Sequence, residues 1–247
     1  MTNDLRLTFI GSGNAFSPGG LCCSGFAVNE KILFDTPPQT LSSMNTVGLD
    51  PNAIETVVLS HHHGDHFLGL PFLLLHWRWR GRQKPVRIIG PRGTQALATK
   101  ISEMVFPGVL ETVGYDLEWD DVPPGKLIRV GDLELEPHQM THDDGLDICL
   151  GYAARLGGRR FSYTGDTILC DAVLELAKDQ EVMVSECASR ANRIPVHMNL
   201  VDDIPVVRAA LPKDAKLLLT HVDVDVKVDA DILPNTEVAK DFATYTF

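Results

Sequence analysis

Short apolar or alternating runs, separated by polar and glycine-containing stretches, divide the chain into elements of predictable type. We predict strands near residues 5–10, 24–35 (a hairpin), 55–60, 86–90 and 216–220, several more within 115–165, and helices at 67–80, 93–106, 168–178 and 203–211. Mixed strand runs with single helices between them indicate an α/β fold in which two sheets pack face to face and helices lie outside.

Two segments stand out from this pattern. The run Phe67–Leu75 is apolar almost all round, so we expect its helix to be buried. The tail after Val222 alternates aspartate with valine and alanine, and we interpret it as an acidic edge element or lid segment.

Composition is typical of a single enzyme-sized domain. The chain has 247 residues, 44% of them hydrophobic, and shows no repeat or linker, so we predict one domain over 1–247. No stretch approaches about twenty uninterrupted apolar residues, and Met1–Arg6 lacks a secretory signal, which predicts a cytoplasmic protein with no membrane partner. Five scattered cysteines without a C-x-x-C pair argue against a disulfide framework and a thiolate zinc site.

The charge balance restricts the partners. With 22 basic and 33 acidic residues the formal net charge is −11, which is unfavourable for holding a long polyanion. One basic block stands out, formed by Arg78, Arg80, Arg82, Lys84, Arg87 and Arg92 with Trp77 and Trp79 between them. It has two interpretations: a substrate-binding element in which Arg78 and Arg80 hold a phosphate or stack a base, or a solvated helix end whose arginine stems pack on tryptophan.

The most informative segment is His61-His62-His63-Gly64-Asp65-His66, directly after the apolar run 54–60. Alternate residues leaving a strand point the same way, so His61 and His63 would bind one metal ion. Asp65 and His66, past the turn that Gly64 permits, can reach a second ion. Imidazole and carboxylate suit zinc first, then manganese or iron. The alternative is a histidine-rich surface loop that binds metal adventitiously.

Two ions need more ligands than one loop provides, since each takes about three or four. Three candidates follow short strand-like runs: His142 after 133–136, Asp166 after 160–164, and His221 after 216–220. All three would open onto the same rim of a sheet as the histidine loop.

With these residues in view, the chain resembles the metallo-β-lactamase superfamily, and within it ribonuclease Z and its phosphodiesterase relatives. Further similar segments are Leu7–Gly13, Lys31–Asp35, Gly69–Pro71 and Ile88–Gly93. The resemblance implies a four-layer αββα sandwich of two mixed β-sheets flanked by helices, and a homodimer. It also implies one ion held by His61, His63 and His142, a second held by Asp65, His66 and His221, and Asp166 bridging the two.

Two departures from ribonuclease Z bear on the substrate. That family inserts a long arm that grips transfer RNA between the third and fourth metal motifs, whereas His142 and Asp166 lie 24 positions apart (142 to 166). The family's Asp-Cys-Gly-Glu-Gly-like turn becomes Asp35–Gln39, and its histidine before the glutamate is replaced by Ser185. Both departures point to a substrate smaller than transfer RNA.

The resemblance also implies that Glu186 and His197 protonate the leaving oxygen, a role that suits an imidazolium held by a carboxylate. Asp65 could orient the attacking water. We therefore predict a dinuclear-metal hydrolase acting through a metal-bridging hydroxide on a small phosphodiester, a cyclic nucleotide or a short RNA. Alternatives are a ribonuclease Z-like endoribonuclease for transfer-RNA 3′ ends, an acyl hydrolase (thioesterase, lactonase or β-lactamase-like), and a non-enzymatic metal-binding sensor module.

Overall fold

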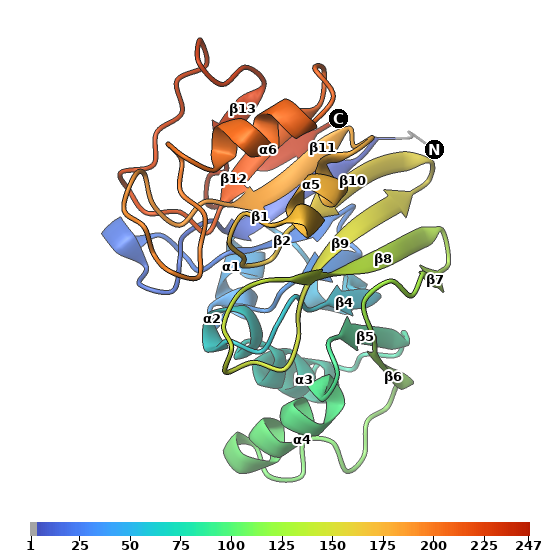
Figure 1. The fold of residues 1–247 in the computed structure, drawn as a ribbon. Helices are drawn as coiled ribbons and strands as arrows, with labels where there is room; N and C mark the ends of the chain where they lie inside the picture. Colours follow the sequence, from blue (N-terminus) through green and yellow to red (C-terminus); the bar gives the residue numbers. More distant parts are fainter. Residues whose placement is uncertain (1–3) are drawn as a thin grey trace.

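The computed structural model describes residues 4–247, and within them two seven-stranded sheets face each other (Figure 1). In order across the first sheet lie β14 (Thr244–Thr246), β1 (Arg6–Gly11), β2 (Gly25–Val28), β3 (Ile32–Phe34), β4 (Thr56–Val58), β5 (Val86–Gly90) and β6 (Leu117–Asp121). Across the second lie β13 (Thr236–Val238), β12 (Lys216–Thr220), β11 (Val182–Glu186), β10 (Arg159–Tyr163), β9 (Cys149–Leu156), β8 (Leu133–Met140) and β7 (Ile128–Val130).

The helices of the same residues are α1 (Thr40–Thr46), α2 (Gly64–Phe67), α3 (Leu70–Trp79), α4 (Thr94–Val105), α5 (Asp171–Ala177) and α6 (Ile204–Ala210), with 3₁₀ turns at Pro18–Gly20 and Pro51–Ala53. Helices α3 and α4 lie outside the first sheet, and α5 and α6 outside the second (Figure 1). The predicted αββα sandwich is confirmed.

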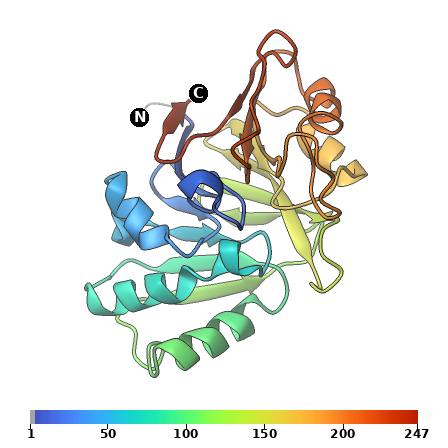
Figure 2. The same ribbon diagram turned by 90° about the vertical axis from the view of Figure 1, so that its left-hand side faces the viewer.

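The two sheets share one pairing pattern. In each, three antiparallel pairs are followed by three parallel pairs: β14 to β3 and then β3 to β6 in the first sheet, β7 to β10 and then β10 to β13 in the second. The pattern of the first sheet is completed by β14 from the far end of the chain, which pairs with β1 (Figure 2). The C-terminal tail thus supplies an edge strand to each sheet.

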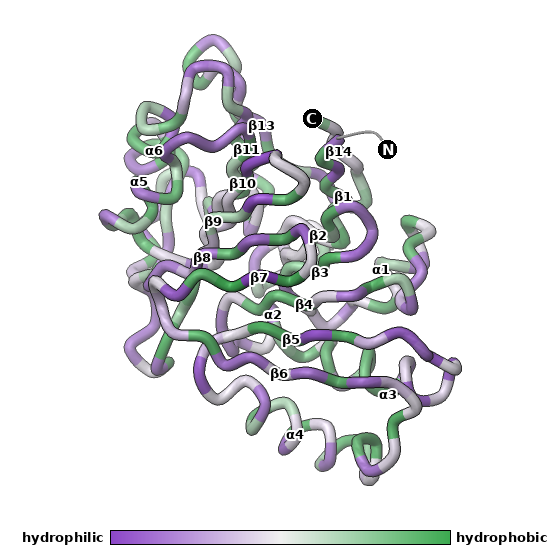
Figure 3. The backbone as a smooth tube through the Cα atoms, turned by 90° about the vertical axis from the view of Figure 1, so that its right-hand side faces the viewer, coloured by the Kyte–Doolittle hydropathy of each residue, from purple (hydrophilic) through white to green (hydrophobic). Residues whose placement is uncertain are grey.

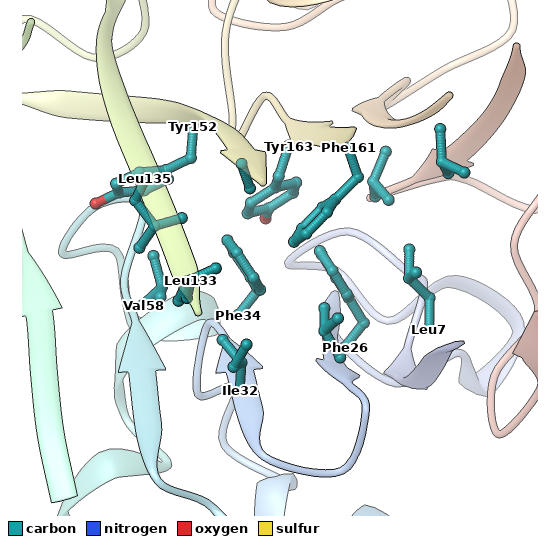
Figure 4. Close-up of a cluster of buried hydrophobic side chains, with 14 of the residues drawn as sticks. Leu7, Phe26, Ile32, Phe34, Val58, Leu133, Leu135, Tyr152, Phe161 and Tyr163 are labelled. Carbon is teal, nitrogen blue, oxygen red and sulfur yellow. The ribbon is translucent and has the colours of Figure 1, made fainter. Parts of the chain in front are cut away.

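Period-two alternation explains why both faces of each sheet are apolar. Val58 and Leu218 point into the core between the sheets, where Phe26, Phe34 and Tyr163 stack and cross at ring distances of 4.9–5.9 Å (Figure 4). Their chain neighbours point outward: Val57 packs under α3, and Leu217 and Leu219 pack under α5 and α6. Parallel strands covered on both sides are expected to be this uniformly hydrophobic.

Edge strand β6 carries Glu118, Asp120 and Asp121, and its hydrophilic character is visible in Figure 3. Charged side chains at such an edge discourage pairing with another chain.

The predicted helix at 67–80 is present as α3 but begins three residues later, at Leu70, because Phe67 ends the preceding turn α2. Pro71 lies in the first turn of α3, where its missing N–H costs nothing, and Gly69 lies so close to residue 37 that a Cβ would be 2.2 Å from the Pro37 carbonyl oxygen. The expected burial holds for one face only: Leu73, Leu74 and Trp77 are buried, whereas Phe72 is 48% exposed.

Two smaller differences concern the secondary structure. Strand β8 continues to Met140, so His142 follows it closely, and helix α1 was not predicted. Across residues 4–247 no helix is long and apolar enough to cross a membrane. Met1–Asn3, used in the argument about secretion, lie outside the described residues.

Candidate metal centre

The histidine loop leaves the end of β4 and turns at once into the single-turn helix α2. His61 is completely buried, the backbone N–H of His66 donates to the His63 carbonyl oxygen, and α2 directs Asp65 and His66 back towards the sheets. His142, Asp166 and His221 arrive from the loops after β8, β10 and β12. All seven predicted ligands therefore meet at one end of the sandwich.

The first group of ligands, His61, His63 and His142, presents three imidazole nitrogens to one point. The Nε2 atoms of His61 and His142 each lie 3.1 Å from His63 Nδ1. These three residues offer ligand atoms close enough together to hold one metal ion. Three converging nitrogens with an open side match an open zinc site.

The second group combines Asp65, His66, Asp166 and His221. Asp65 Oδ2 lies 3.2 Å from His66 Nε2 and 3.3 Å from His221 Nε2, and Asp166 Oδ2 lies 3.3 Å and 3.2 Å from the same two atoms. Asp166 Oδ2 is also 3.9 Å from the Nε2 atoms of His61 and His142. Asp166 thus lies between the two groups.

The donor set fits divalent cations. His66 Nε2 and Asp166 Oδ1 are buried and make no hydrogen bond within the described chain, and polar atoms in that state are costly unless another ligand satisfies them. Imidazole nitrogen and carboxylate oxygen are the ligands that zinc and similar metals take. The cluster can therefore bind divalent metal ions.

Asp35, at the end of β3, is the buried support of the second group. Its carboxylate accepts hydrogen bonds from Ser60 N (2.7 Å), Ser60 Oγ (2.8 Å), Tyr163 OH (2.7 Å) and His66 Nδ1 (2.8 Å). With Nδ1–H held by Asp35, His66 presents Nε2 to the cluster. From the sequence, Asp35 was named only within two segments compared with ribonuclease Z, and no role was predicted for it. The available signal was a carboxylate directly after an apolar strand.

The histidines of the first group also have a polar partner for the ring nitrogen that faces away from the cluster. Ser60 Oγ, which donates to Asp35, lies 2.9 Å from His61 Nδ1 and can accept its proton, while the Val196 carbonyl oxygen accepts from His142 Nδ1 at 2.9 Å. His63 is reversed: its Nδ1 faces the cluster and its Nε2 lies 3.1 Å from Asp143 Oδ2. None of these supporting contacts was predicted from the sequence.

Backbone strain accompanies the site. Asp35 and His221, at the ends of β3 and β12, have positive φ values of 58° and 56°. Non-glycine residues hold this left-handed conformation only where surrounding contacts enforce it, and such positions concentrate at functional sites.

Protonation differs between the groups. Burial lowers the pKa of His61 and of His142, which keeps both neutral and able to donate a lone pair to a metal. Burial also acts to lower the pKa of His66, yet Asp166 and Asp35 raise it well above its usual value. In the metal-free protein His66 is therefore protonated and carries a positive charge.

Beside the cluster, Glu186 and His197 form a buried acid pair. Glu186 Oε1 accepts hydrogen bonds from Thr167 N (2.7 Å) and His197 Nδ1 (2.9 Å), and His197 Nδ1 lies 4.0 Å from Asp166 Oδ2. Burial works against protonation of His197, but the hydrogen bond to Glu186 outweighs it and raises its pKa to about 9. The structure therefore places the His197 imidazole beside the metal-type ligands.

Comparison with known proteins agrees with this arrangement. A family model described as a β-lactamase superfamily domain matches residues 30–222, which include all seven ligands. The chain belongs to the metallo-β-lactamase superfamily. Among curated members, a ribonuclease Z from Methanothermobacter thermautotrophicus is 24% identical over 300 aligned positions, covering 97% of this chain and 96% of the relative. A ribonuclease BN from Escherichia coli is 29% identical over 272 positions, covering 86% and 88%.

Solved structures of the superfamily show the same fold. YhfI from Bacillus subtilis superposes with a TM-score of 0.80 at 18% identity, covering 99% of this chain and 100% of that one. The short form of human tRNase Z gives 0.78 at 18% identity, with 97% and 98% covered, and a diphosphatase from the PhnP family gives 0.73 at 19%, with 99% and 97% covered.

Arg78 and Arg80 do not belong to the metal-type groups found among residues 4–247. They lie at the C-terminal end of α3, about 15 Å along a ten-residue helix from its start near the histidine loop. Arg78 stacks on Trp79 at 5.3 Å, and the neighbouring Arg82 is buried against Trp77 with its guanidinium donating to the Pro85 carbonyl oxygen at 2.7 Å. Arg82 thus matches the interpretation of arginine packed on tryptophan.

An open cavity of about 650 Å³ lies at the other end of the sandwich. Its lining includes Lys31 and Arg87, and also Thr56 and Leu133, which begin β4 and β8, two of the strands whose far ends lead to the ligands. None of the metal-type groups found among residues 4–247 includes a residue of this cavity, so the chemistry is assigned to the histidine end.

Proposed function

We propose that this protein is a metal-dependent phosphodiester hydrolase that acts on a small phosphodiester, such as a cyclic nucleotide or a short RNA. The observation that carries the proposal is the Glu186–His197 pair, because a phosphodiester must expel an alkoxide and therefore needs an acid at the leaving oxygen. A thioesterase, which expels a stable thiolate, or a metal sensor has less need of such a group.

In this proposal His61, His63 and His142 would hold one divalent cation, Asp65, His66 and His221 would hold another, and Asp166 would serve both. We propose zinc for both, on the nitrogen-rich donor set. When bound, such a pair lowers the pKa of a coordinated water and stabilises the charge that develops on the phosphoryl oxygens.

The protein's own residues supply positioning and proton transfer. Asp65 is the proposed acceptor for the proton of the attacking water, since it offers one oxygen to the second group and its other oxygen would remain free. His197 is the proposed donor: Glu186 occupies its Nδ1, which leaves Nε2–H for the leaving oxygen. Glu186 in turn is fixed by the backbone N–H groups of Thr167 and Met198.

The preference for a small substrate rests on charge and on missing segments. The alignment to the archaeal ribonuclease Z spans 300 positions although this chain has 247 residues, so that relative contains segments that this chain lacks. The net charge of −11 also disfavours a long polyanion. The ribonuclease names of the relatives make a larger RNA the second candidate substrate.

A substrate panel tests the proposal. We expect the zinc-loaded protein to hydrolyse bis-p-nitrophenyl phosphate and a cyclic nucleotide faster, in kcat/KM, than a thioester of p-nitrothiophenol or a transfer-RNA precursor. Activity confined to the thioester would refute a phosphodiesterase.

Replacement of the acid gives the sharper measurement. His197→Ala should lower kcat for an alkyl phosphodiester by about 10²–10⁴-fold, yet leave hydrolysis with p-nitrophenolate as leaving group nearly unchanged, because p-nitrophenolate departs without protonation. His76→Ala, a histidine on α3 outside the cluster, is the matched control and should alter neither substrate.

The proposed homodimer would use an apolar surface on α3 and α4. Phe72, Trp79, Met104 and Val105 are 48–74% exposed there, and the ring of Phe72 contacts that of Phe106 at 5.2 Å. Such exposed patches mark interaction sites. Light scattering should give twice the monomer mass for the wild type and a monomer for Trp79→Glu; a monomeric wild type would rule the dimer out.

A further inference from the structure

The loop Thr141–Ile148, between β8 and β9, lies over the first group of ligands and connects the two sheets there. Its first part carries the ligand His142, and the next residue, Asp143, contacts His63 from the histidine loop of the other sheet. Further along, Asp147 forms an ion pair with Arg92, which follows β5. One short segment thus supplies a ligand and contacts a second ligand.

His63 is the least constrained histidine of the first group. Its side chain is 33% exposed, whereas those of His61 and His142 are 0% and 1% exposed. His61 is oriented by the hydroxyl of the buried Ser60, and His142 by the backbone carbonyl oxygen of Val196. For His63 the corresponding contact is the half-exposed carboxylate of Asp143, with Oδ2 3.1 Å from Nε2.

Only one tautomer of His63 can serve the cluster. Its Nδ1 faces the Nε2 atoms of His61 and His142, so this nitrogen must carry the free lone pair and Nε2 must carry the proton. A carboxylate that accepts from Nε2–H selects that tautomer and fixes the plane of the ring.

We propose that Asp143 is a positioning residue that selects the tautomer and orientation of His63 and thereby sets the affinity of the first group for its divalent cation. The proposal rests on the assignment of His61, His63 and His142 to one cation under the proposed function, and it is independent of the substrate.

The chain offers a matched set of variants. Asp143→Ala removes both charge and acceptor, whereas Asp143→Asn removes the charge and keeps an oxygen that can accept. Asp144→Asn makes the same change of charge one residue along, at an exposed side chain outside the metal-type groups of residues 4–247. If Asp143 positions His63, Asp143→Ala should have the largest effect and Asp144→Asn the smallest. If only negative charge near the site matters, Asp143→Asn and Asp144→Asn should have similar effects.

Zinc affinity, measured by competition with a chelating dye, gives the first test. We expect Asp143→Ala to weaken one of two binding steps by about 10–100-fold, Asp143→Asn to weaken it less, and Asp144→Asn to change it less than about twofold. Equal losses in Asp143→Asn and Asp144→Asn, or wild-type affinity in Asp143→Ala, would overturn the proposal.

The ¹⁵N shifts of the His63 ring in the metal-free protein give a second test that does not depend on catalysis. The wild type and Asp144→Asn should show the Nε2–H tautomer, and Asp143→Ala, which lacks the acceptor, should show a larger fraction of the other form. An unchanged tautomer in Asp143→Ala would contradict the proposal. Failure of the proposed function would be observed separately from failure of this proposal, as a wild-type protein that binds two zinc ions but hydrolyses no phosphodiester.

Discussion

The two groups of ligands in this metal centre differ in burial and charge although they share one loop and one rim. The first group, His61, His63 and His142, consists of imidazoles alone, and His63 reaches the surface. The second group, Asp65, His66, Asp166 and His221, includes two carboxylates, and its His66 lies completely buried against Asp35.

This difference follows from where the ligands leave the sheets. Asp35 and Tyr163 come from strands that face each other across the inner core, so the support of His66 lies within the packed core. The support of His63 comes from a solvent-exposed loop. Two carboxylates attract a divalent cation far more strongly than imidazoles alone, so we expect the second group to retain its cation longest when a chelator is added.

The largest effect is expected from Asp166→Ala, which should affect both groups of ligands. Asp166→Ala removes the one carboxylate that lies within 3.9 Å of ligand nitrogens in both groups. We expect loss of both cations by elemental analysis and a fall in kcat of at least about 10³-fold, roughly 4 kcal/mol. A variant with two bound ions and full activity would contradict the bridging assignment.

A larger loss in the second group than in the first should follow from Asp35→Asn, because Asp35 contacts His66 directly and reaches His61 only through Ser60. Removing a buried charged acceptor should lower the free energy of unfolding by about 2 kcal/mol and weaken one zinc-binding step by about 10–100-fold. Urea unfolding in excess chelator and zinc competition measure the two effects separately. Asp214→Asn, at an exposed position after α6, is the control, and equal behaviour of the two variants would remove Asp35 from the site.

His197 lies between the groups, with its ring 4.9 Å from that of His142 and 5.0 Å from that of His221, and its titration gives a pH test. Because Glu186 raises the pKa of His197, the imidazolium is present at low pH and is lost as pH rises through that pKa. Glu186→Gln lowers the pKa, so kcat/KM for an alkyl phosphodiester should decline at a lower pH than in the wild type. Bound cations should shift the pH profiles of both proteins to lower pH without reversing their order. If the two profiles decline at the same pH, Glu186 does not set the pKa of His197.

The smallest effect is expected from Arg78 and Arg80, which lie a helix length from both groups. The double change to alanine should leave KM for bis-p-nitrophenyl phosphate within about twofold, since exposed charges at this separation are screened. An oligonucleotide long enough to reach α3 should show a larger increase in KM. No increase with any length of RNA would leave the arginines without a role in substrate binding.

The local pattern of the chain was sufficient for the elements and for the ligand types. Strands with apolar alternation, the loop His61–His66 and the strand-end residues His142, Asp166 and His221 are all properties of short segments, and such properties depend on near neighbours. Helix α3 shows the limit of this reasoning, since apolar residues all round it did not bury Phe72. Burial depends on which element covers a face, and residues near α3 in sequence do not specify that.

Sequence alone therefore determined which residues could bind metal and that a layered α/β fold would carry them. Only the tertiary structure decided how each one is used: that Asp35 supports His66, that Asp143 contacts His63 from 80 positions away, and that Arg82 is a buried structural residue. The physical reason is that hydrogen bonds and burial depend on angstrom-scale distances between distant segments, which strand order and register set only once the chain has folded.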